Sequence, residues 1–139
     1  FNCRMGDPET QPIMMRLKTD LVELLEAALA GKLDKAEAEW DRRFALGVVL
    51  AAANYPETPR KGDPIHGLPA AASEESHVFH AGTTETGGQV VTAGGRVLCV
   101  TALGDNVRLA QKHAYDVVDQ IHFDGMQCRR DIGHRAVKR

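Results

Sequence analysis

The sequence predicts an α+β fold, and two observations support this prediction. Apolar residues recur at three- and four-residue steps in segments 10–31 and 105–121, which is the spacing of an amphipathic helix. Segment 77–103 lies between them and consists of alternating or β-branched runs separated by two glycine pairs, a pattern typical of hairpins. Helices that flank a group of antiparallel strands indicate the α+β class.

The first helical segment follows a polar run at the start of the chain. Thr10 is expected to be its N-cap, with Pro12 tolerated in the first turn. Thr19 and Asp20 followed by Glu23 give a second capping signal, so the segment forms either one helix or two short ones. Gly31 is expected to end it. The apolar stripe contains Ile13, Met14, Leu17, Leu21, Leu24, Leu25, Ala28 and Leu29.

The next part of the chain changes from a charged connector to strand-like runs. Residues 32–43 are charged and amphipathic, which predicts a connector with one further helical turn, anchored against the sheet by Trp40. The apolar run 46–53 has the length of a strand and stops at the turn-forming residues 54–56. Residues 65–68 are expected to form a short edge strand.

The clearest strand signals come next. Strands are predicted over residues 77–82, 89–93 and 96–103, with hairpin turns at 86–88 and 93–95. A glycine pair can also cradle a phosphate, but that arrangement requires a helix directly after it, and neither pair precedes one. The turn interpretation is therefore the better one.

A second helix is predicted after the strands. Asp105 is expected to be its N-cap. Its apolar residues fall on one face, which predicts that the helix packs across the hairpin sheet. That face contains Val107, Ala110, Ala114, Val117, Val118 and Ile121.

Composition limits the class of protein. A chain of 139 residues and 15.1 kDa forms one domain, or one domain and a piece of another. Its net charge of −2 and pI of about 6.3 argue against a nucleic-acid-binding or membrane-surface protein, since either needs a basic face. No apolar run reaches the roughly 20 residues that span a bilayer. Three widely spaced cysteines favour neither a disulfide framework nor a zinc site, and predict reduced thiols in a cytoplasmic protein.

The polar run at residues 2–11 is the first candidate site. In an extended strand Asn2 and Arg4 lie on the same face, about 7 Å apart, and the glycine that follows lets Asp7 turn toward that face. An amide oxygen beside carboxylates suits magnesium, and a guanidinium there stabilises charge on a transferring phosphoryl group or an acyl phosphate. The alternative is that this run only starts the helix and that Arg4 pairs with Glu9.

The basic C-terminal end is the second candidate site. Residues 129–139 are locally basic in an otherwise balanced chain, and Arg129 and Arg130 stand side by side at its start. Arginine forks suit phosphate oxygens. The segment is either a solvated tail or an anion site.

Six segments carry motifs that occur in this order in one known family. The segments are 2–12, 18–21, 80–83, 92–98, 101–104 and 129–133, and they read NCRMGDPETQP, KTDL, HAGT, TAGGRVL, TALG and RRDIG. On these motifs the chain resembles the phosphoribosylamine–glycine ligases, also called glycinamide ribonucleotide synthetases, an ATP-grasp family of purine biosynthesis. The resemblance covers the C-terminal third of such an enzyme.

The resemblance implies a division of the chain. Residues 1–31 would be the C-terminal piece of the ATP-grasp domain, beginning with a strand end, and residues 32–139 the C-terminal α+β domain. The family's phosphate loop, its adenine contacts and its first metal ligand would precede Phe1. The chain alone is therefore expected to be inactive.

The resemblance also implies roles for individual residues. Asn2 matches a ligand of Mg²⁺ (or Mn²⁺), and Arg4 matches an arginine that faces the acyl phosphate. Asp7 falls where the second substrate is held, and orients the amine of phosphoribosylamine. Arg129 and Arg130 match a position where a related carboxylase binds a ribose 5′-phosphate, and the choice between them is open.

The reaction implied uses ATP to phosphorylate glycine to glycyl phosphate, which the nitrogen of 5-phosphoribosylamine then attacks. Glycinamide ribonucleotide, ADP and phosphate result. The partners implied are these small molecules and the rest of the parent enzyme, with no nucleic acid and no membrane. The alternative is a non-catalytic α+β module that binds a phosphate or a protein partner through its basic C-terminal end.

Overall fold

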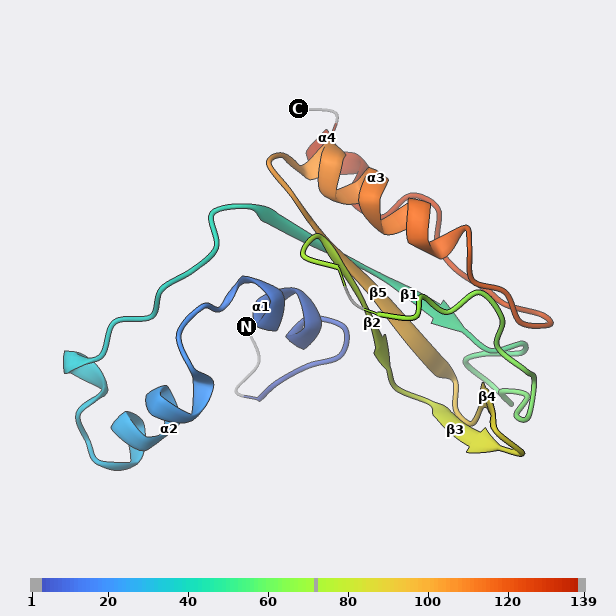
Figure 1. Cartoon of the computed structure of the whole chain (residues 1–139), viewed down its shortest axis with the longest axis horizontal. Helices are drawn as coiled ribbons and strands as arrows, with labels where there is room; N and C mark the ends of the chain where they lie inside the picture. The colour runs from blue at the N-terminus through green and yellow to red at the C-terminus, as the bar shows by residue number, and fades with distance from the viewer. Residues whose placement is uncertain (1–3, 72, 138–139) are drawn as a thin grey trace.

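The computed structural model describes residues 4–71 and 73–137 (Figure 1). Its helices are α1 (Thr10–Arg16), α2 (Leu21–Leu29), the short 3₁₀ helix η1 (Leu33–Lys35), α3 (Val107–Val118) and α4 (His134–Val137). Its strands are β1 (Phe44–Ala51), β2 (Ser76–His80), β3 (Thr83–Thr86), β4 (Gln89–Thr92) and β5 (Arg96–Gly104). Helices and antiparallel strands in one chain confirm the predicted α+β class. Phe1 and Asn2, the predicted strand end, lie outside the described residues.

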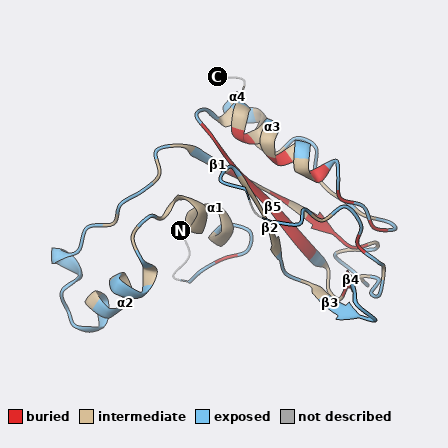
Figure 2. Ribbon diagram, viewed as in Figure 1, coloured by how far each residue is buried: buried red, intermediate tan, exposed pale blue. Residues whose placement is uncertain are grey.

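The main sheet has three strands in the order β1-β5-β2, and both pairs are antiparallel. Val100 at the middle of β5 lies opposite Val48 of β1 and Val78 of β2. Every residue of β5 after Arg96 is buried, because the strand is paired on both edges and covered on both faces (Figure 2). Most of the hydrophobic core is built around this strand.

Strands β3 and β4 form a separate two-stranded ribbon. Gly87 and Gly88 connect them with φ values of 59° and 76°, which only glycine adopts readily, so the first predicted hairpin turn is confirmed. The second predicted turn is wrong, because β4 and β5 belong to different sheets. Gly94 instead allows two segments of the main chain to cross closely. A Cβ on Gly82 would lie only 2.7 Å from the Cα of Gly94.

Helix α3 covers one face of the three-stranded sheet (Figure 1). Ala110, Ala114 and Val118 are completely buried against it, as the apolar spacing predicts. The predicted cap is wrong by one residue: the side chain of Asn106, rather than that of Asp105, accepts a hydrogen bond of 2.9 Å from the main-chain N–H of Leu109.

Helix α1 contacts the opposite face of the same sheet. Alternation along β1 sends Leu46, Val48 and Leu50 into the core beneath α3. The residues between them face the other way, and a Cβ on Gly47 would lie 3.4 Å from Cγ of Pro12 in α1. The sheet therefore carries a helix on each side, with α1 covering only part of its face.

The N-terminal segment forms two short helices, one of the two alternatives that the sequence allows. Asp20 caps α2 by accepting a hydrogen bond of 2.8 Å from the main-chain N–H of Val22. Thr10 is not the N-cap of α1, because Glu9 holds that position, while the Thr10 hydroxyl donates to the Gly6 carbonyl. Gly31 ends α2 with a φ of 65°, as predicted.

The connector matches its prediction only in part. It contains the single turn η1, but Trp40 is 45% exposed, so the expected anchoring against the sheet is wrong. A main-chain bridge between Leu17 and Trp40 holds the connector beside α1 instead. Residues 65–68 form no strand either; isolated bridges at Pro64 and His66 link this stretch to its neighbours.

The C-terminal segment returns to the sheet after α3. Ala51 and Gln127 exchange two main-chain hydrogen bonds of 2.8 and 2.9 Å across an antiparallel bridge. This contact places the residues around 127 beside the end of β1, next to the candidate site described below. In the part of the chain that the structure describes, no helix is both long and apolar enough to cross a membrane.

Candidate functional site

A cavity of about 530 Å³ lies on the sheet face opposite α3. Its floor is the outward face of β1, from Gly47 to Ala51. Its walls are Pro8 before α1, Tyr55 and Arg96 at the end of the sheet, and four residues that follow α3, namely Gln127, Cys128, Arg129 and Ile132. The two ends of the described chain therefore meet across one hollow.

Arg96 connects three parts of this site. Its Nη1 donates to the main-chain oxygen of Asp7 and lies 3.5 Å from the Asp7 carboxylate. Its Nε donates a hydrogen bond of 3.0 Å to the Tyr55 hydroxyl. The hydrogen bond to Tyr55 raises the pKa of Arg96 above its ordinary value. Arg96 thus stays charged while it faces the cavity.

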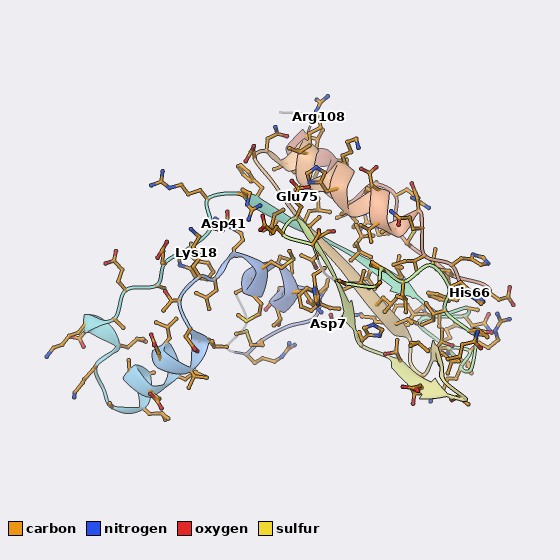
Figure 3. All side chains as sticks on the ribbon, viewed as in Figure 1. Asp7, Lys18, Asp41, His66, Glu75 and Arg108 are labelled. Carbon is orange, nitrogen blue, oxygen red and sulfur yellow. The ribbon has the colours of Figure 1, made fainter. Side chains whose placement is uncertain are left out.

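Asp7 lies between α1 and the sheet (Figure 3). Besides Arg96, it is held by the side chain of Gln11, whose Nε2 donates to Oδ1 at 2.8 Å. Gln11 stands one turn into α1, so the start of that helix positions the carboxylate. Asp7 is 42% exposed at its side chain, which leaves it open to a ligand.

The two arginines at the start of the basic end point in different directions. Arg129 lines the cavity and makes a two-pronged pair with Asp131, with N–O distances of 2.9 and 2.7 Å. This pair lowers the pKa of Asp131. Arg130 instead pairs with Asp119 at the end of α3, and its guanidinium carbon lies 5.7 Å from the centre of the Tyr115 ring.

The remaining predicted site residues stand apart from the cavity or outside the description. Arg4 is exposed, and its guanidinium donates to the main-chain oxygen of the adjacent Met5 at 3.3 Å. Asn2, the predicted metal ligand, lies outside the described residues. The structure therefore places Arg129 in the lining of the cavity and Asp7 beside it, in contact with the lining residue Arg96, and does not bring Arg4 or Arg130 there.

Few of the described side chains at the candidate site could bind a metal ion. Within residues 4–71 and 73–137, no cluster of three or more His, Cys, Asp or Glu side chains has the arrangement of a metal site. Asp7, the acidic residue at the candidate site, is already engaged by Gln11 and Arg96. The described residues by themselves do not fit a complete magnesium site.

Sequence reasoning missed Arg96 and Tyr55 as site residues. Arg96 belongs to the segment 92–98, whose glycine pair was interpreted only as a hairpin turn. Tyr55 follows the strand end at which the chain was expected to turn. A larger cavity, of about 690 Å³, lies beside Phe44 and the start of α3, and includes none of the predicted site residues among those that the structure describes.

Comparison with known proteins places the chain in a family. Residues 45–135 match the family described as "Phosphoribosylglycinamide synthetase, C domain". Two relatives named phosphoribosylamine–glycine ligase, from Ralstonia nicotianae and Vibrio cholerae, are each 63% identical over 139 residues. These matches cover the whole chain but only 33% and 32% of the relatives.

A solved structure agrees with the sequence matches. The phosphoribosylamine–glycine ligase of Thermotoga maritima superposes with a TM-score of 0.72 and 38% identity, covering 94% of this chain and 32% of that protein. The chain belongs to the phosphoribosylglycinamide synthetase C-domain family, and the predicted resemblance is confirmed. It spans about one third of the length of the curated relatives it matches.

Proposed function

We propose that this chain is the C-terminal part of an ATP-dependent ligase of purine biosynthesis, which joins glycine to 5-phosphoribosylamine. Glycyl phosphate is the intermediate, and glycinamide ribonucleotide, ADP and phosphate are the products. The observation that carries the proposal is the match of the whole chain to phosphoribosylamine–glycine ligases at 63% identity. A cytoplasmic location belongs to the proposal, and the free thiols of Cys99 and Cys128 suit it.

The cavity supports a role in holding the amine substrate. Arg129 offers a charged fork for the ribose 5-phosphate. Asp7 lies beside the hollow, held through its contact with Arg96, and accepts a hydrogen bond from the substrate amine so that the nitrogen faces the acyl carbon. In this arrangement the described residues bind and orient phosphoribosylamine, while the activated glycine is supplied from the rest of the enzyme.

Arg4 and Asn2 serve the acyl phosphate in this proposal. Arg4 is exposed, and among the described residues its guanidinium donates to the main-chain oxygen of the adjacent Met5, so its charge is available to a phosphoryl oxygen. Asn2 would give one ligand to Mg²⁺ or Mn²⁺, and the other ligands and the ATP contacts would come from elsewhere in the enzyme. The metal supplies charge neutralisation at the phosphates when it is bound.

The alternative, a non-catalytic module that binds partners through a basic tail, has weaker support. Arg129 and Arg130 are each paired with a carboxylate of the same chain. An acidic protein partner needs an extended surface of excess positive charge, which these pairs reduce, whereas a single phosphate needs only the N–H groups that a paired guanidinium still offers.

The test is steady-state kinetics of the full-length protein that carries this chain, with ATP, glycine and 5-phosphoribosylamine as substrates. Arg129→Ala is expected to raise KM for phosphoribosylamine about 10- to 100-fold, the scale of a lost charged hydrogen bond. Asp7→Asn is expected to lower kcat about 100-fold. Arg135→Ala, which removes the same charge from the same segment, is the matched control. Glycine-independent ATP hydrolysis alone would refute the ligase assignment.

A further inference from the structure

We propose that Arg96 and Arg129 together form a phosphate-monoester site, and that Arg130 has no part in it. This inference rests on the proposed function and names the residues that would hold its phosphorylated substrate. The two arginines are 33 positions apart by number (129 − 96), yet both line the same cavity. They enter it from different elements, Arg96 at the start of β5 and Arg129 in the C-terminal segment.

Both guanidiniums keep a donor available. Arg96 uses Nε for Tyr55 and Nη1 for Asp7, and within the described chain its Nη2 has no hydrogen-bond partner. Arg129 uses Nε and Nη2 for Asp131, and no described residue accepts from its Nη1. An arginine held on one edge by a carboxylate or a phenol is fixed in direction, so its remaining N–H groups bind a ligand with less loss of side-chain entropy.

The charge of the cavity favours an anion. Arg96 and Arg129 are the charged residues among the described residues that line it, and no carboxylate is among them. The floor is apolar, formed by Gly47, Val49 and Ala51, with Ile132 beside it. Each guanidinium has a carboxylate partner, Asp7 at 3.5 Å from Arg96 and Asp131 at 2.7 Å from Arg129, but neither carboxylate lines the cavity. The surface that faces a ligand therefore presents two guanidiniums beside an apolar floor, which suits a compact anion.

Arg96 also ties the anion site to Asp7. The same guanidinium that faces the cavity holds the main chain of Asp7 and lies 3.5 Å from its carboxylate. A phosphate on Arg96 and an amine on Asp7 would therefore sit at a fixed separation. This relation selects a ligand that carries a phosphate at one end and an amine at the other, which is the form of the proposed substrate.

Arg130 is excluded by its surroundings. Its guanidinium is paired with Asp119, which caps the C-terminal end of α3, and lies over the ring of Tyr115 on α3. Helix α3 covers the opposite face of the sheet from the cavity floor. Moving Arg130 to the cavity would break both contacts.

The test is calorimetric titration of the full-length protein that carries this chain with ribose 5-phosphate, in the absence of ATP and glycine, so that it needs no turnover. Arg96→Ala and Arg129→Ala are each expected to weaken binding about tenfold or more, the scale of a lost charged hydrogen bond. Arg130→Ala and Arg135→Ala are expected to change it less than about twofold. Arg96→Lys keeps the charge but loses the fork, and we expect it to fall between wild type and Arg96→Ala.

Three results overturn the proposal. The first is no saturable binding of ribose 5-phosphate by the wild-type protein. The second is a loss in Arg130→Ala with none in Arg96→Ala. The third is equal binding of unphosphorylated ribose, which would show that no phosphate is recognised. This titration is independent of catalysis. If the protein binds ribose 5-phosphate but does not catalyse the ligase reaction, the proposed function is refuted and the phosphate site is not.

Discussion

The hydroxyl of Tyr115 in α3 donates a hydrogen bond of 2.7 Å to the main-chain carbonyl of Arg129. The same oxygen accepts a bond of 3.2 Å from the main-chain N–H of Ile132. One phenol thus holds the C-terminal segment on both sides of residues 130–131. The direction in which Arg129 enters the cavity depends on this clamp.

Tyr115→Phe should loosen the C-terminal segment while keeping the ring. We expect the free energy of unfolding to fall by about 1–2 kcal/mol, because the Ile132 N–H loses its partner in a partly buried place. Urea denaturation followed by circular dichroism measures the change. Lys112→Ala removes an exposed ion pair of the same helix and should cost less than about 1 kcal/mol. Equal losses in the two variants would show that the clamp contributes nothing special.

Two leucines provide a matched pair for the core. Leu50 of β1 is completely buried in the core, whereas Leu29 at the end of α2 is 90% exposed. Leu50→Ala is expected to lower the free energy of unfolding by about 2–5 kcal/mol, and Leu29→Ala by less than about 0.5 kcal/mol. Chemical denaturation of both variants makes the comparison. A small effect at Leu50 would mean that the sheet does not pack as described.

Asp41 should make stability depend on acid pH. Hydrogen bonds from the Arg43 side chain lower its pKa from 3.8 to about 2. A lowered folded-state pKa gives stability that is complete above the unfolded value and is lost as pH falls toward about 2. The difference in thermal midpoint between wild type and Asp41→Asn should therefore shrink between about pH 4 and pH 2. In an Arg43→Ala background this pH dependence should vanish; its persistence would assign it to another group.

The two described cysteines should react at different rates. Burial raises the pKa of the Cys99 thiol, which is 2% exposed, so its reactive thiolate is disfavoured. Cys128 is half-buried and lines the cavity. In a Cys3→Ser background, iodoacetamide should label Cys128 first and Cys99 only on unfolding, as peptide mass spectrometry would report. Ribose 5-phosphate should slow labelling of Cys128; faster labelling of Cys99 would contradict the fold.

Much of the fold is readable from the sequence because its signals are local. The helical spacing around Ala110, Ala114 and Val118 marks the buried face of α3, and the glycines at 87 and 88 mark a turn that needs positive φ. The pair at 94 and 95 does not form the predicted hairpin turn, because glycine also allows close main-chain crossings, and the two uses look alike in sequence. Asp105 and Asn106 are both residue types that cap helices, and they are adjacent. The sequence therefore does not show at which of the two the first turn of α3 begins.

The site is harder to predict from the sequence than the fold, because it is assembled by contacts between residues far apart in the chain. Asp7 and Arg129 were singled out from polar clusters near the two ends, and both reach the cavity border. Arg96 was missed because its contact with Asp7 joins residues separated by 89 positions. Likewise, only the position of Asp119 at the end of α3 shows that Arg130 turns away from its neighbour. The division of the chain at residue 31 stays a prediction.

The antiparallel bridge between Ala51 and Gln127 has a consequence for the order in which the protein matures. As the polypeptide leaves the ribosome, the wall at Ala51 emerges before the wall at Gln127, with β5 and α3 between them. A nascent chain can therefore have its sheet and ribbon in place and still be unable to capture a small molecule. Any compound that occupies the hollow binds only when both walls are in place, and it stabilises that folded state against unfolding.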